Sequence, residues 1–439
     1  MSELTHIIKK NNEYFAVDGD MLAVHKLTGV IAEKISTIDA KSREMIAKRL
    51  IIKNHNNVCP QLINHVDYRR CSRLVLNLTS NCNLRCKYCY ANAGLYASDQ
   101  IPTNMTLKTL ENALDVSLKI FPDGIKTVQF FGGEPLMNKP ILLMAIQKIR
   151  AICKNKEIAP PQFTIVTNGT LIDDDCLELF NNYFSSVTIS IDGCKDVNDS
   201  YRVFANSSFS VYETIVSCIS KMSKSKRNYL LSLEGSLTNV HMNDFLNNGD
   251  LSSIDDLFRL GADFYQFAPA FDTNNSGFSM TEYPKENICD FFDILTKRLL
   301  TECNYYRIGT KSKIKNLFVD KEYGTKVCGA GITELTIDVN GLLYPCFMFA
   351  GIEKFVLGKV DNFDMEEFNA SRGRIREFFQ RAELCSKCTN CWAKKMCGQS
   401  YSRCLGARYL ITGDVIDPID LGCELSKTVI ERLIKETLQ

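Results

Sequence analysis

The stretch Cys82-Asn-Leu-Arg-Cys86-Lys-Tyr-Cys89 is the most informative part of the chain, because it spaces three cysteines as C-x3-C-x2-C. Soft thiolate ligands suit iron–sulfur clusters, and a [4Fe–4S] cube is normally held by four of them. Three thiolates would hold three irons and leave the fourth iron open. An open metal position is a place for chemistry, just as a catalytic zinc site keeps one ligand position free.

Two other uses of this triplet are a zinc site and a partial disulfide framework. Zinc needs a fourth protein ligand nearby, and no His or Cys follows Cys89 at a suitable spacing. Disulfides belong to oxidising compartments, whereas residues 1–30 mix charges among their apolar positions and resemble no secretory signal. We therefore favour iron ligation and expect a cytoplasmic protein.

Composition narrows the class of protein. The 439 residues are 45% hydrophobic and 23% charged, which is ordinary for a globular chain of two or three domains. The 52 basic and 51 acidic residues nearly cancel, which argues against nucleic acid or a membrane surface as a partner. No apolar run approaches the length of a membrane span. Nineteen cysteines then point to metal ligation in a reducing compartment.

After the triplet, strand-like and helix-like segments alternate, which predicts βαβ units around a parallel sheet. Between the expected strands lie amphipathic segments long enough for crossover helices, at 107–120, 140–153, 211–222 and 286–300. The expected strands are 73–78, 127–131, 163–167, 187–191, 230–237 and 264–268.

The triplet, with the aromatic Tyr88 before its last cysteine, resembles the signature of radical S-adenosylmethionine (SAM) enzymes. The resemblance implies that Cys82, Cys86 and Cys89 hold a [4Fe–4S] cluster whose open iron is chelated by SAM. It also implies an α/β fold, a partial (β/α)6 TIM-type barrel over residues 71–310. In complete barrels of this type, chemistry lies at the C-terminal ends of the strands.

Several motifs at the expected strand ends resemble the SAM-binding positions of that family. Gly132-Gly133-Glu134-Pro135 follows the second strand, and the segment from Asp192-Gly193 to Arg202 follows the fourth. The family role of the first motif is to bind the SAM amino group, and Arg202 is expected to hold the SAM carboxylate. Each motif taken singly can also be a turn or a surface ion pair. The resemblance implies these cofactor contacts: Tyr88, Gly132, Gly133, Glu134, Asn168, Ser190, Asp192, Arg202 and Phe267.

A second group of cysteines lies beyond residue 325 and resembles the SPASM domain, which holds two auxiliary [4Fe–4S] clusters. The last spacing, Cys397-x6-Cys404, is longer than the usual x3. Asn340-Gly341, between two strand-like segments, predicts a type I′ hairpin turn. A zinc ribbon is the alternative use of these thiols. Residues 311–439 are expected to form the bridging region and this domain. The resemblance assigns Cys328, Cys346, Cys385 and Cys404 to the nearer cluster, with Cys385 the less defined ligand, and Cys388, Cys391, Cys397 and Cys423 to the farther one.

Residues 1–70 lie outside both modules. Three short strands are expected at 6–9, 14–17 and 21–26, followed by helices at 29–36 and 40–51. This order resembles the winged-helix-like PqqD-type element that binds the leader of a precursor peptide, often by adding it as a strand at a sheet edge. An accessory domain of other use is the alternative.

The three modules together resemble the radical SAM maturases of ribosomally made peptides. That resemblance implies cleavage of SAM to a 5′-deoxyadenosyl radical, and as partners a precursor peptide with a leader and a flavodoxin- or ferredoxin-type reductant. Streptide-forming maturases, which join a lysine to a tryptophan through a carbon–carbon bond, match best by length, domain order and auxiliary cysteines. Thioether-forming maturases of the sactipeptide and ranthipeptide type are the near alternative.

Two further classes stay open. Formylglycine-forming sulfatase maturation normally has an aspartate after the hairpin cysteine, whereas Cys346 is followed here by Phe347. A noncatalytic iron–sulfur protein for peptide binding or electron transfer would gain nothing from a three-cysteine site. The general base cannot be assigned from sequence; Asp320, Glu322 and Glu234 are the candidates.

Overall fold

The computed structural model describes residues 5–28, 60–62, 67–96, 101, 103–224, 226–270, 277–320, 322–323, 328–397 and 403–438. The chain divides into two compact units. We call residues 66–283 and 329–379 the barrel unit, and residues 1–65, 284–328 and 380–439 the terminal unit. Within the described residues, no helix combines the length and apolarity needed to cross a bilayer.

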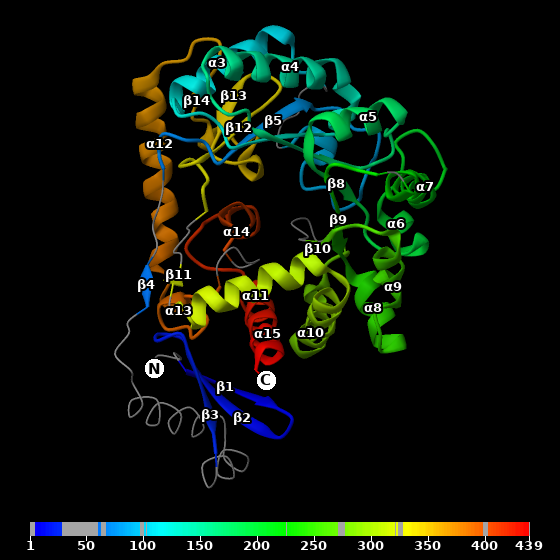
Figure 1. Cartoon of the computed structure of the whole chain (residues 1–439), viewed down its shortest axis with the longest axis vertical. Helices are drawn as coiled ribbons and strands as arrows, with labels where there is room; N and C mark the ends of the chain where they lie inside the picture. Colours follow the sequence, from blue (N-terminus) through cyan, green and yellow to red (C-terminus); the bar gives the residue numbers. More distant parts are fainter. Residues whose placement is uncertain are drawn as a thin grey trace. The chain divides into compact units, whose positions relative to one another are not determined.

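The barrel unit is built on a nine-stranded sheet of order β10-β9-β8-β7-β6-β5-β12-β13-β14. The six strands expected from sequence all form, pair in parallel with their sequence neighbours, and produce the predicted partial barrel (Figure 1). Their bounds are β5 (Arg73–Thr79), β6 (Thr127–Gly132), β7 (Gln162–Thr167), β8 (Phe184–Ser190), β9 (Leu230–Leu237) and β10 (Phe264–Pro269).

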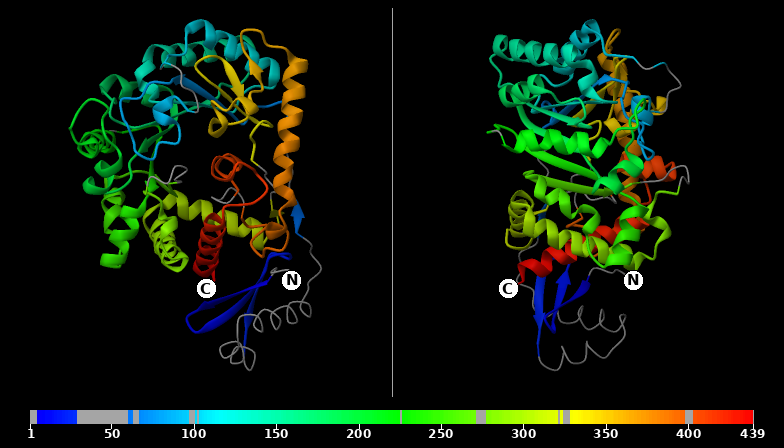
Figure 2. Two further views of the ribbon diagram at one scale, coloured as in Figure 1. Left: turned by 180° about the vertical axis from the view of Figure 1, so that it is seen from behind. Right: turned by 90° about the vertical axis from the view of Figure 1, so that its right-hand side faces the viewer.

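Helices connect these strands and cover the outer face of the sheet (Figure 2). Three of the four expected crossover helices appear here as α3 (Leu107–Ile120), α4 (Lys139–Asn155) and α7 (Val211–Lys224), and the fourth, expected at 286–300, forms as α10 (Lys285–Glu302) in the terminal unit. Four further helices were not predicted: α5 (Asp174–Tyr183), α6 (Lys195–Tyr201), α8 (Asn239–Asn248) and α9 (Ser252–Asp255). Sequence signals for α5 exist, because Asp173 caps it by accepting the Cys176 amide at 3.0 Å. Short 3₁₀ turns complete the unit: η1 (Asn92–Gly94), η2 (Pro135–Asn138), η3 (Asp256–Leu260), η4 (Met280–Glu282), η5 (Phe347–Phe349) and η6 (Glu353–Phe355).

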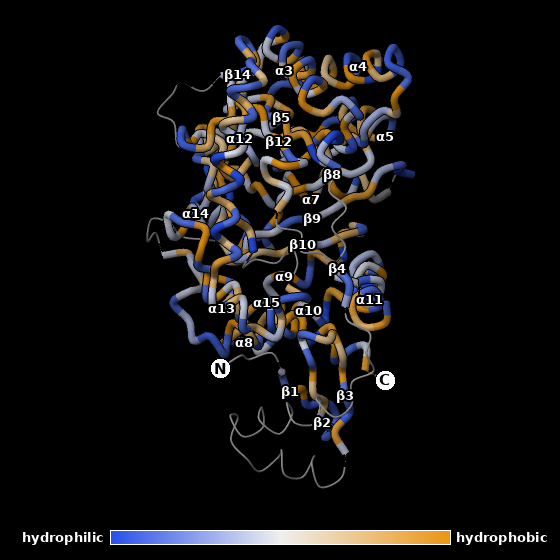
Figure 3. Tube along the Cα trace, turned by 90° about the vertical axis from the view of Figure 1, so that its left-hand side faces the viewer, coloured by the Kyte–Doolittle hydropathy of each residue, from blue (hydrophilic) through white to orange (hydrophobic). Residues whose placement is uncertain are grey.

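Burial alternates along the strands with the period of two expected for β-structure. On β8, Val187 and Ile189 are fully buried, whereas Thr188 between them is partly exposed. The parallel register pairs Ser190 with Glu234 and Glu234 with Gln266, so these three side chains share the face opposite the helices. Figure 3 colours the chain trace by hydropathy, and orange hydrophobic and blue hydrophilic stretches occur throughout the barrel unit. The polar side chains therefore line the barrel interior.

The hairpin that precedes Cys346 extends the same sheet. Strand β12 (Glu334–Ile337) pairs in parallel with β5, and β13 (Leu342–Tyr344) pairs with β12 and with β14 (Gly358–Lys359). The type I′ prediction for its turn is wrong. Only Gly341 has a positive φ (78°), and its amide donates to the Asp338 carbonyl at 3.1 Å. A three-residue loop ending in a left-handed glycine forms instead. Helix α12 (Met365–Gln380) follows.

The terminal unit contains the expected three strands as an antiparallel sheet, β1 (Thr5–Lys10), β2 (Glu13–Asp18) and β3 (Ala23–Leu27). The helices predicted at 29–36 and 40–51 lie outside the described residues. The rest of the unit comprises β4 (Gln61–Leu62), α10 (Lys285–Glu302), α11 (Asn304–Phe318), β11 (Glu322–Tyr323), η7 (Arg381–Leu384), α13 (Ser386–Thr389), α14 (Leu405–Thr412) and α15 (Asp420–Thr437).

The N-terminal sheet and the C-terminal segment share one hydrophobic core. Ile8 and Val17 of the sheet are buried in one cluster with Trp392, Met396 and Ile434. Burial of such side chains stabilises each by about 1.5–3 kcal/mol. The N-terminal sheet is thus part of the terminal unit's core and not a separately packed module.

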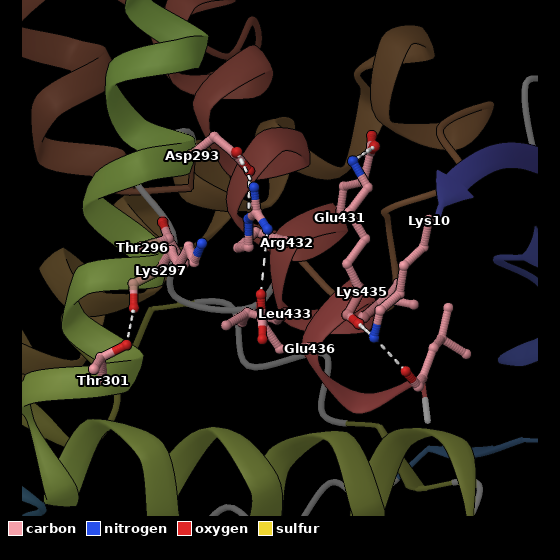
Figure 4. Close-up of polar contacts among 12 residues, drawn as sticks. Lys10, Asp293, Thr296, Lys297, Thr301, Glu431, Arg432, Leu433, Lys435 and Glu436 are labelled. Carbon is pink, nitrogen blue, oxygen red and sulfur yellow. Dashed lines mark hydrogen bonds and ion pairs between the residues drawn. The ribbon is translucent and has the colours of Figure 1, made fainter. Parts of the chain in front are cut away.

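Polar contacts hold α15 in that unit (Figure 4). The Arg432 guanidinium forms a bidentate ion pair with Asp293 of α10. Lys10 of β1 donates its ammonium to the carbonyl oxygens of Lys435 and Leu438. A cation at this position suits the negative end of the helix dipole.

Candidate SAM and iron–sulfur site

The cysteine triplet lies in the loop that follows β5, at the C-terminal end of the parallel strands. The loop is fixed by the segment after α6, because the amides of Arg85 and Lys87 donate to the carbonyls of Val203 and Tyr201 at 2.8 and 3.0 Å. Backbone amides also point at two of the sulfurs. Leu84 N–H donates to Cys82 Sγ at 3.4 Å and Ala93 N–H to Cys89 Sγ at 3.3 Å.

The chemistry of these thiols fits an iron–sulfur cluster. Burial raises the pKa of Cys82 to about 11 and that of Cys86 to about 12, and each is raised further by the charge of neighbouring triplet cysteines. Arg202 opposes the effect at Cys86. Metal ligation requires thiolates, so iron would add to the positive charge of Arg202 in stabilising them, and amide–sulfur hydrogen bonds tune bound clusters.

The two glycines of the Gly-Gly-Glu-Pro motif let the chain after β6 pass close to the cluster loop. A Cβ on Gly132 would lie 2.3 Å from the Thr79 carbonyl oxygen, and one on Gly133 would lie 2.2 Å from the Asn81 carbonyl oxygen. Gly132 also has φ of +133°, which favours glycine. The glycines therefore permit backbone-to-backbone packing beside the cysteines.

The Glu134 carboxylate is fully buried and bonded within the chain. One oxygen accepts from the Leu136 amide at 3.0 Å and the Thr167 hydroxyl at 2.7 Å, and the other from the Asn168 amide at 2.7 Å. Burial raises its pKa to about 7, although these three bonds oppose the rise. Glu134 thus ties the ends of β6 and β7 together.

Asn168 and Ser190 lie at the ends of β7 and β8. The Asn168 amide donates to the Asn83 side chain at 2.9 Å and lies 3.9 Å from Cys82 Sγ. Ser190 is partly buried and paired in register with Glu234. Both expected cofactor residues therefore face the same end of the barrel as the triplet.

Asp192, Arg202 and Tyr88 form a buried group beside Cys86. Arg202 donates from Nε and Nη2 to the two Asp192 oxygens, both at 3.0 Å, and the Tyr88 hydroxyl donates to Asp192 Oδ2. Burial alone would lower the pKa of Arg202, but the Asp192 carboxylate holds it well above its ordinary value. Arg202 Nη1 remains 4.0 Å from Cys86 Sγ.

His241, which the sequence did not single out, supports this group. Its Nδ1 accepts the Thr238 amide at 3.0 Å, so Nε2 carries the proton and donates to the Asp192 carbonyl at 3.0 Å. Burial lowers the pKa of His241, which keeps the ring neutral. The helix-capping sequence Thr238-x-x-His241 at the start of α8 could have indicated this role of His241.

Phe267 differs from the other expected cofactor residues. It is 2% exposed and its ring lies 6.3 Å from that of Phe258 in η3. Its register partner on β9 is Gly235, which belongs to the helix-covered face. The side chain packs in the core, and a contact with SAM stays a prediction.

The sequence did not indicate that Tyr90 and Tyr96, which follow the triplet, are related in space to Glu234 of β9. The rings of Tyr90 and Tyr96 meet edge to face at 6.2 Å. Although Tyr90 as a whole is 45% exposed, desolvation of its hydroxyl raises its pKa well above the usual value, and the charges of Tyr96, Cys89, Cys346 and Glu234 act in the same direction. Tyr90 therefore lies within electrostatic reach of Cys89, of the hairpin cysteine Cys346 and of Glu234. Burial also raises the pKa of Glu234.

The second cysteine group is partly assembled in the terminal unit. Burial raises the pKa of Cys423 to about 11, and the charges of Cys388, Cys397 and Cys391 raise it further. Three of the thiols expected to hold the farther cluster thus lie within electrostatic reach of the fourth, Cys423. Cys346 belongs to the barrel unit, whereas Cys328, Cys385 and Cys404 belong to the terminal unit. The nearer cluster's ligand set stays a prediction. Every cysteine in the described part of the chain is a free thiol.

Comparison with protein families agrees with this geometry. The profile of the Radical SAM superfamily matches residues 76–233, and that of the SPASM iron–sulfur cluster-binding domain matches residues 328–392. The chain contains a radical SAM domain and a SPASM domain. Related proteins catalyse radical reactions, and this chain is a radical SAM enzyme that binds SAM and iron–sulfur clusters.

Two curated relatives match this radical SAM enzyme over most of its length. The radical SAM cyclopropyl synthase TigE of Paramaledivibacter caminithermalis is 28% identical over 91% of the chain and 83% of TigE. A cysteine-type anaerobic sulfatase-maturating enzyme of Clostridium novyi is 25% identical over 73% of the chain and 84% of that enzyme.

Two solved structures share the fold. The structure of anSMEcpe with bound AdoMet and Cp18Cys peptide superposes with a TM-score of 0.63 at 18% identity, over 83% of this chain and 97% of that one. Streptococcus suis SuiB bound to precursor peptide SuiA has a TM-score of 0.53 at 14% identity, over 96% and 99% of the two chains.

Proposed function

We propose that this enzyme modifies a ribosomally made precursor peptide in the cytoplasm by forming an intramolecular carbon–carbon crosslink of the lysine–tryptophan type. The observation that carries the proposal is the triplet of thiols at the C-terminal end of the barrel strands, beside an interior lined by polar side chains. Relatives named for peptide or protein modification, with one neighbour bound to its precursor peptide, support a peptide substrate. Three [4Fe–4S] clusters and a flavodoxin- or ferredoxin-type reductant complete the proposal.

The chain's residues have distinct roles in this proposal. Cys82, Cys86 and Cys89 would hold the first cluster, where bound SAM supplies a 5′-deoxyadenosyl radical on reduction. Glu134 and the Asp192–Arg202 pair fix the strand ends around it through the bonds described above. The backbone around Gly133, with Asn168, Ser190 and Arg202 Nη1 beside Cys86, would contact SAM.

We assign the proton-accepting role to Glu234. Of the three candidate carboxylates, Asp320 and Glu322 belong to the terminal unit, and Asp320 is paired with Lys315 at 3.7 Å. Glu234 alone stands on a barrel strand, facing the interior beside Ser190. A raised pKa brings a carboxylate closer to the operating pH, which suits a general base.

The N-terminal sheet would recognise the leader of the precursor. In the sheet order β1-β2-β3, strand β3 has one strand neighbour among the described residues. An extended peptide can add to such an edge through main-chain hydrogen bonds. The sheet would thereby raise the concentration of the core peptide near the barrel.

Mass spectrometry of the reconstituted enzyme with its precursor peptide tests the proposal. Crosslinking removes two hydrogens, about 2 Da, and leaves every cysteine of the peptide open to alkylation, since the radical and the rearomatising ring each account for one hydrogen. A thioether has the same mass change but consumes a thiol. A product that lost an alkylatable cysteine would favour the thioether alternative, and an unmodified peptide despite SAM cleavage would refute the proposal.

A further inference from the structure

A cavity of about 170 Å³ lies within the barrel unit between the end of β5 and the β12–β13 hairpin. Its walls include Asn77 and Thr79 of β5, Tyr96 after the triplet loop, and Asp338 of the hairpin turn. A water molecule takes up about 30 Å³ in the liquid, so the space accommodates on the order of five water-sized groups. That is the size of an extended four-carbon chain with a polar head.

One wall of this cavity carries an acceptor that lacks a donor. Asn77 is 2% exposed, and its amide nitrogen donates to the Tyr96 hydroxyl at 3.3 Å. Its Oδ1 is buried and has no hydrogen-bond partner within the described part of the chain. A buried acceptor without a donor costs about 1–3 kcal/mol, and native proteins leave few of them. A ligand in the cavity that donates a hydrogen bond would remove this cost.

The charged residues that line the cavity are both acidic. Asp338 and Glu353 both line it, and none of its described lining residues is a lysine, arginine or histidine. The amides of Asn340 and Leu342 donate to Asp338 Oδ1 at 2.9 and 2.8 Å, which fixes that carboxylate in the turn. Its burial raises the pKa to about 6, which leaves the group mostly ionised at neutral pH. Lys359 lies within electrostatic reach of Asp338 but does not line the cavity, so a cation inside the cavity would complement these acceptors.

We propose that this cavity binds the cationic side chain of a lysine or arginine in the peptide substrate. The inference rests on the proposed function for the identity of the substrate, but not for the presence of the site. Ammonium or guanidinium N–H groups would donate to Asn77 Oδ1 and to the two carboxylates, while the aliphatic stem would lie against Leu342 and Val356.

The position of the cavity suits the binding of a substrate beside the reaction centre. Thr79 and Ser80 in its wall precede Cys82, and Gly94 to Tyr96 follow Cys89. Tyr96 contacts Tyr90, which is in turn within electrostatic reach of Glu234. A basic side chain held here would keep its peptide beside the loop that carries the triplet.

Calorimetry on the reconstituted holoenzyme, without oxygen, tests the site with simple probes. N-acetyl-lysine methylamide and N-acetyl-arginine methylamide are compared with N-acetyl-norleucine methylamide, which keeps the chain and lacks the charge. We expect at least one cationic probe to bind about tenfold more tightly than norleucine, which corresponds to about 1.4 kcal/mol. Equal affinity of all three probes would overturn the proposal.

Variants of the cavity residues test whether the cationic probe binds in this cavity. Glu353→Gln removes an exposed charge and should keep the fold, and Asn77→Leu removes the unpartnered acceptor. Each should lower the preference for the cationic probe severalfold, whereas Glu366→Gln, an exposed charge on α12 outside the cavity, should not. A preference that survives both cavity variants would place the cation elsewhere and refute the site.

The outcome is separable from that of the proposed function. Probe binding requires no turnover, so a preference that depends on Asn77 and Glu353 would stand even where no crosslinked peptide forms. Conversely, crosslinking with no cation preference in the calorimetry would leave the proposed function intact and remove this site.

Discussion

At the scale of single residues, the Asp192–Arg202 pair has the largest energetic consequence. Both Asp192 oxygens are occupied, by Arg202, by Tyr88 and by the Ser236 amide at 2.9 Å, and both charged side chains are buried. A buried ion pair is tolerated because its partners compensate each other, and removal of one partner leaves an uncompensated charge. The same pair borders the cluster site, so its loss affects both stability and cofactor binding.

We expect Asp192→Asn to lower the free energy of unfolding by about 3–5 kcal/mol. Denaturant titration measures the loss. The matched control is Asp123→Asn, which breaks the exposed pair with Arg69 and should cost about 0–1 kcal/mol. Equal losses in the two variants would contradict the structural role given to the buried pair.

Glu234→Gln separates the chemistry on the peptide from cleavage of SAM. The amide keeps the size of the side chain but cannot accept a proton, and general bases contribute about 10²–10⁴-fold. We expect crosslinked peptide to fall in that range while SAM is still cleaved to deoxyadenosine. Gln266→Ala, at the paired position on β10, serves as control and should leave the product yield nearly unchanged. Full product formation by Glu234→Gln would exclude the assigned role.

At the scale of elements, the N-terminal sheet packs on the C-terminal segment through close contacts. A Cβ on Gly19, in the turn between β2 and β3, would lie 1.8 Å from the Trp392 carbonyl oxygen. The His6 and Trp392 rings stack with centroids 4.3 Å apart. Removal of residues 1–70 would therefore uncover Trp392 and its neighbours, so truncation is a poor test of leader binding.

Gly19→Ala should destabilise the terminal unit, since backbone atoms block the added methyl group and a shift of the turn must follow. We expect a loss of about 1–3 kcal/mol, as for overpacked cores. Gly309→Ala is the control in the same unit, because nothing lies within 4 Å of its added Cβ and α11 should gain about 0.5–1 kcal/mol. Thermal unfolding followed by circular dichroism distinguishes the two, and a neutral Gly19→Ala would show that the turn moves freely.

The ion pair between His6 of β1 and Glu431 of α15 should make the stability of the fold depend on pH. Burial alone would raise the pKa of Glu431, but hydrogen bonds from His6 and Lys435 hold it at about 2. A carboxyl with a depressed native pKa stabilises the fold above its unfolded pKa of about 4.3, and that contribution disappears as the pH falls towards 2. The free energy of unfolding, measured with urea, should be higher for the wild type than for Glu431→Gln by up to a few kcal/mol at pH 7. This difference should disappear below pH 4.5. A gap independent of pH would contradict the pairing.

Elements were predictable where local pattern and tertiary role agree. The strands of the barrel carry period-two burial and long apolar runs, and β9 and α3 begin and end at the predicted residues. The hairpin turn was misjudged because Asn-Gly suits two turn types, and only the φ values distinguish them. The partners of Glu134 and of Arg202 come from distant strands, which no local pattern reveals. The core that residues 8–22 share with residues 392–396 could not be predicted for the same reason, because it joins segments far apart in the sequence.

At the scale of the whole molecule, we expect folding of the terminal unit to depend on its iron–sulfur site more than folding of the barrel unit does. The triplet lies on a loop of the barrel unit, whose sheet and helices form a core without iron. Three thiols expected for the farther auxiliary site, Cys388, Cys391 and Cys397, lie in a short helix and turns of the terminal unit, and the fourth, Cys423, lies in α15. Cys391 and Cys397 pack beside the hydrophobic core of that unit. Metal binding at sites of this kind contributes directly to folding free energy.

Iron content and SAM cleavage should therefore respond differently to loss of the two sites. Each cube holds four irons, so the reconstituted enzyme should contain about twelve per chain, and either Cys82/Cys86/Cys89→Ala or Cys388/Cys391/Cys397/Cys423→Ala should leave about eight. The first variant should lose SAM cleavage and keep the stability of the terminal unit. The second should keep SAM cleavage, lose crosslinked peptide, and unfold at a lower temperature, since iron no longer holds the terminal segment. Iron analysis, deoxyadenosine assay and calorimetry distinguish them. Undiminished SAM cleavage in the first variant would disprove the assignment of the triplet, because no other site in the proposal leaves an iron open to SAM.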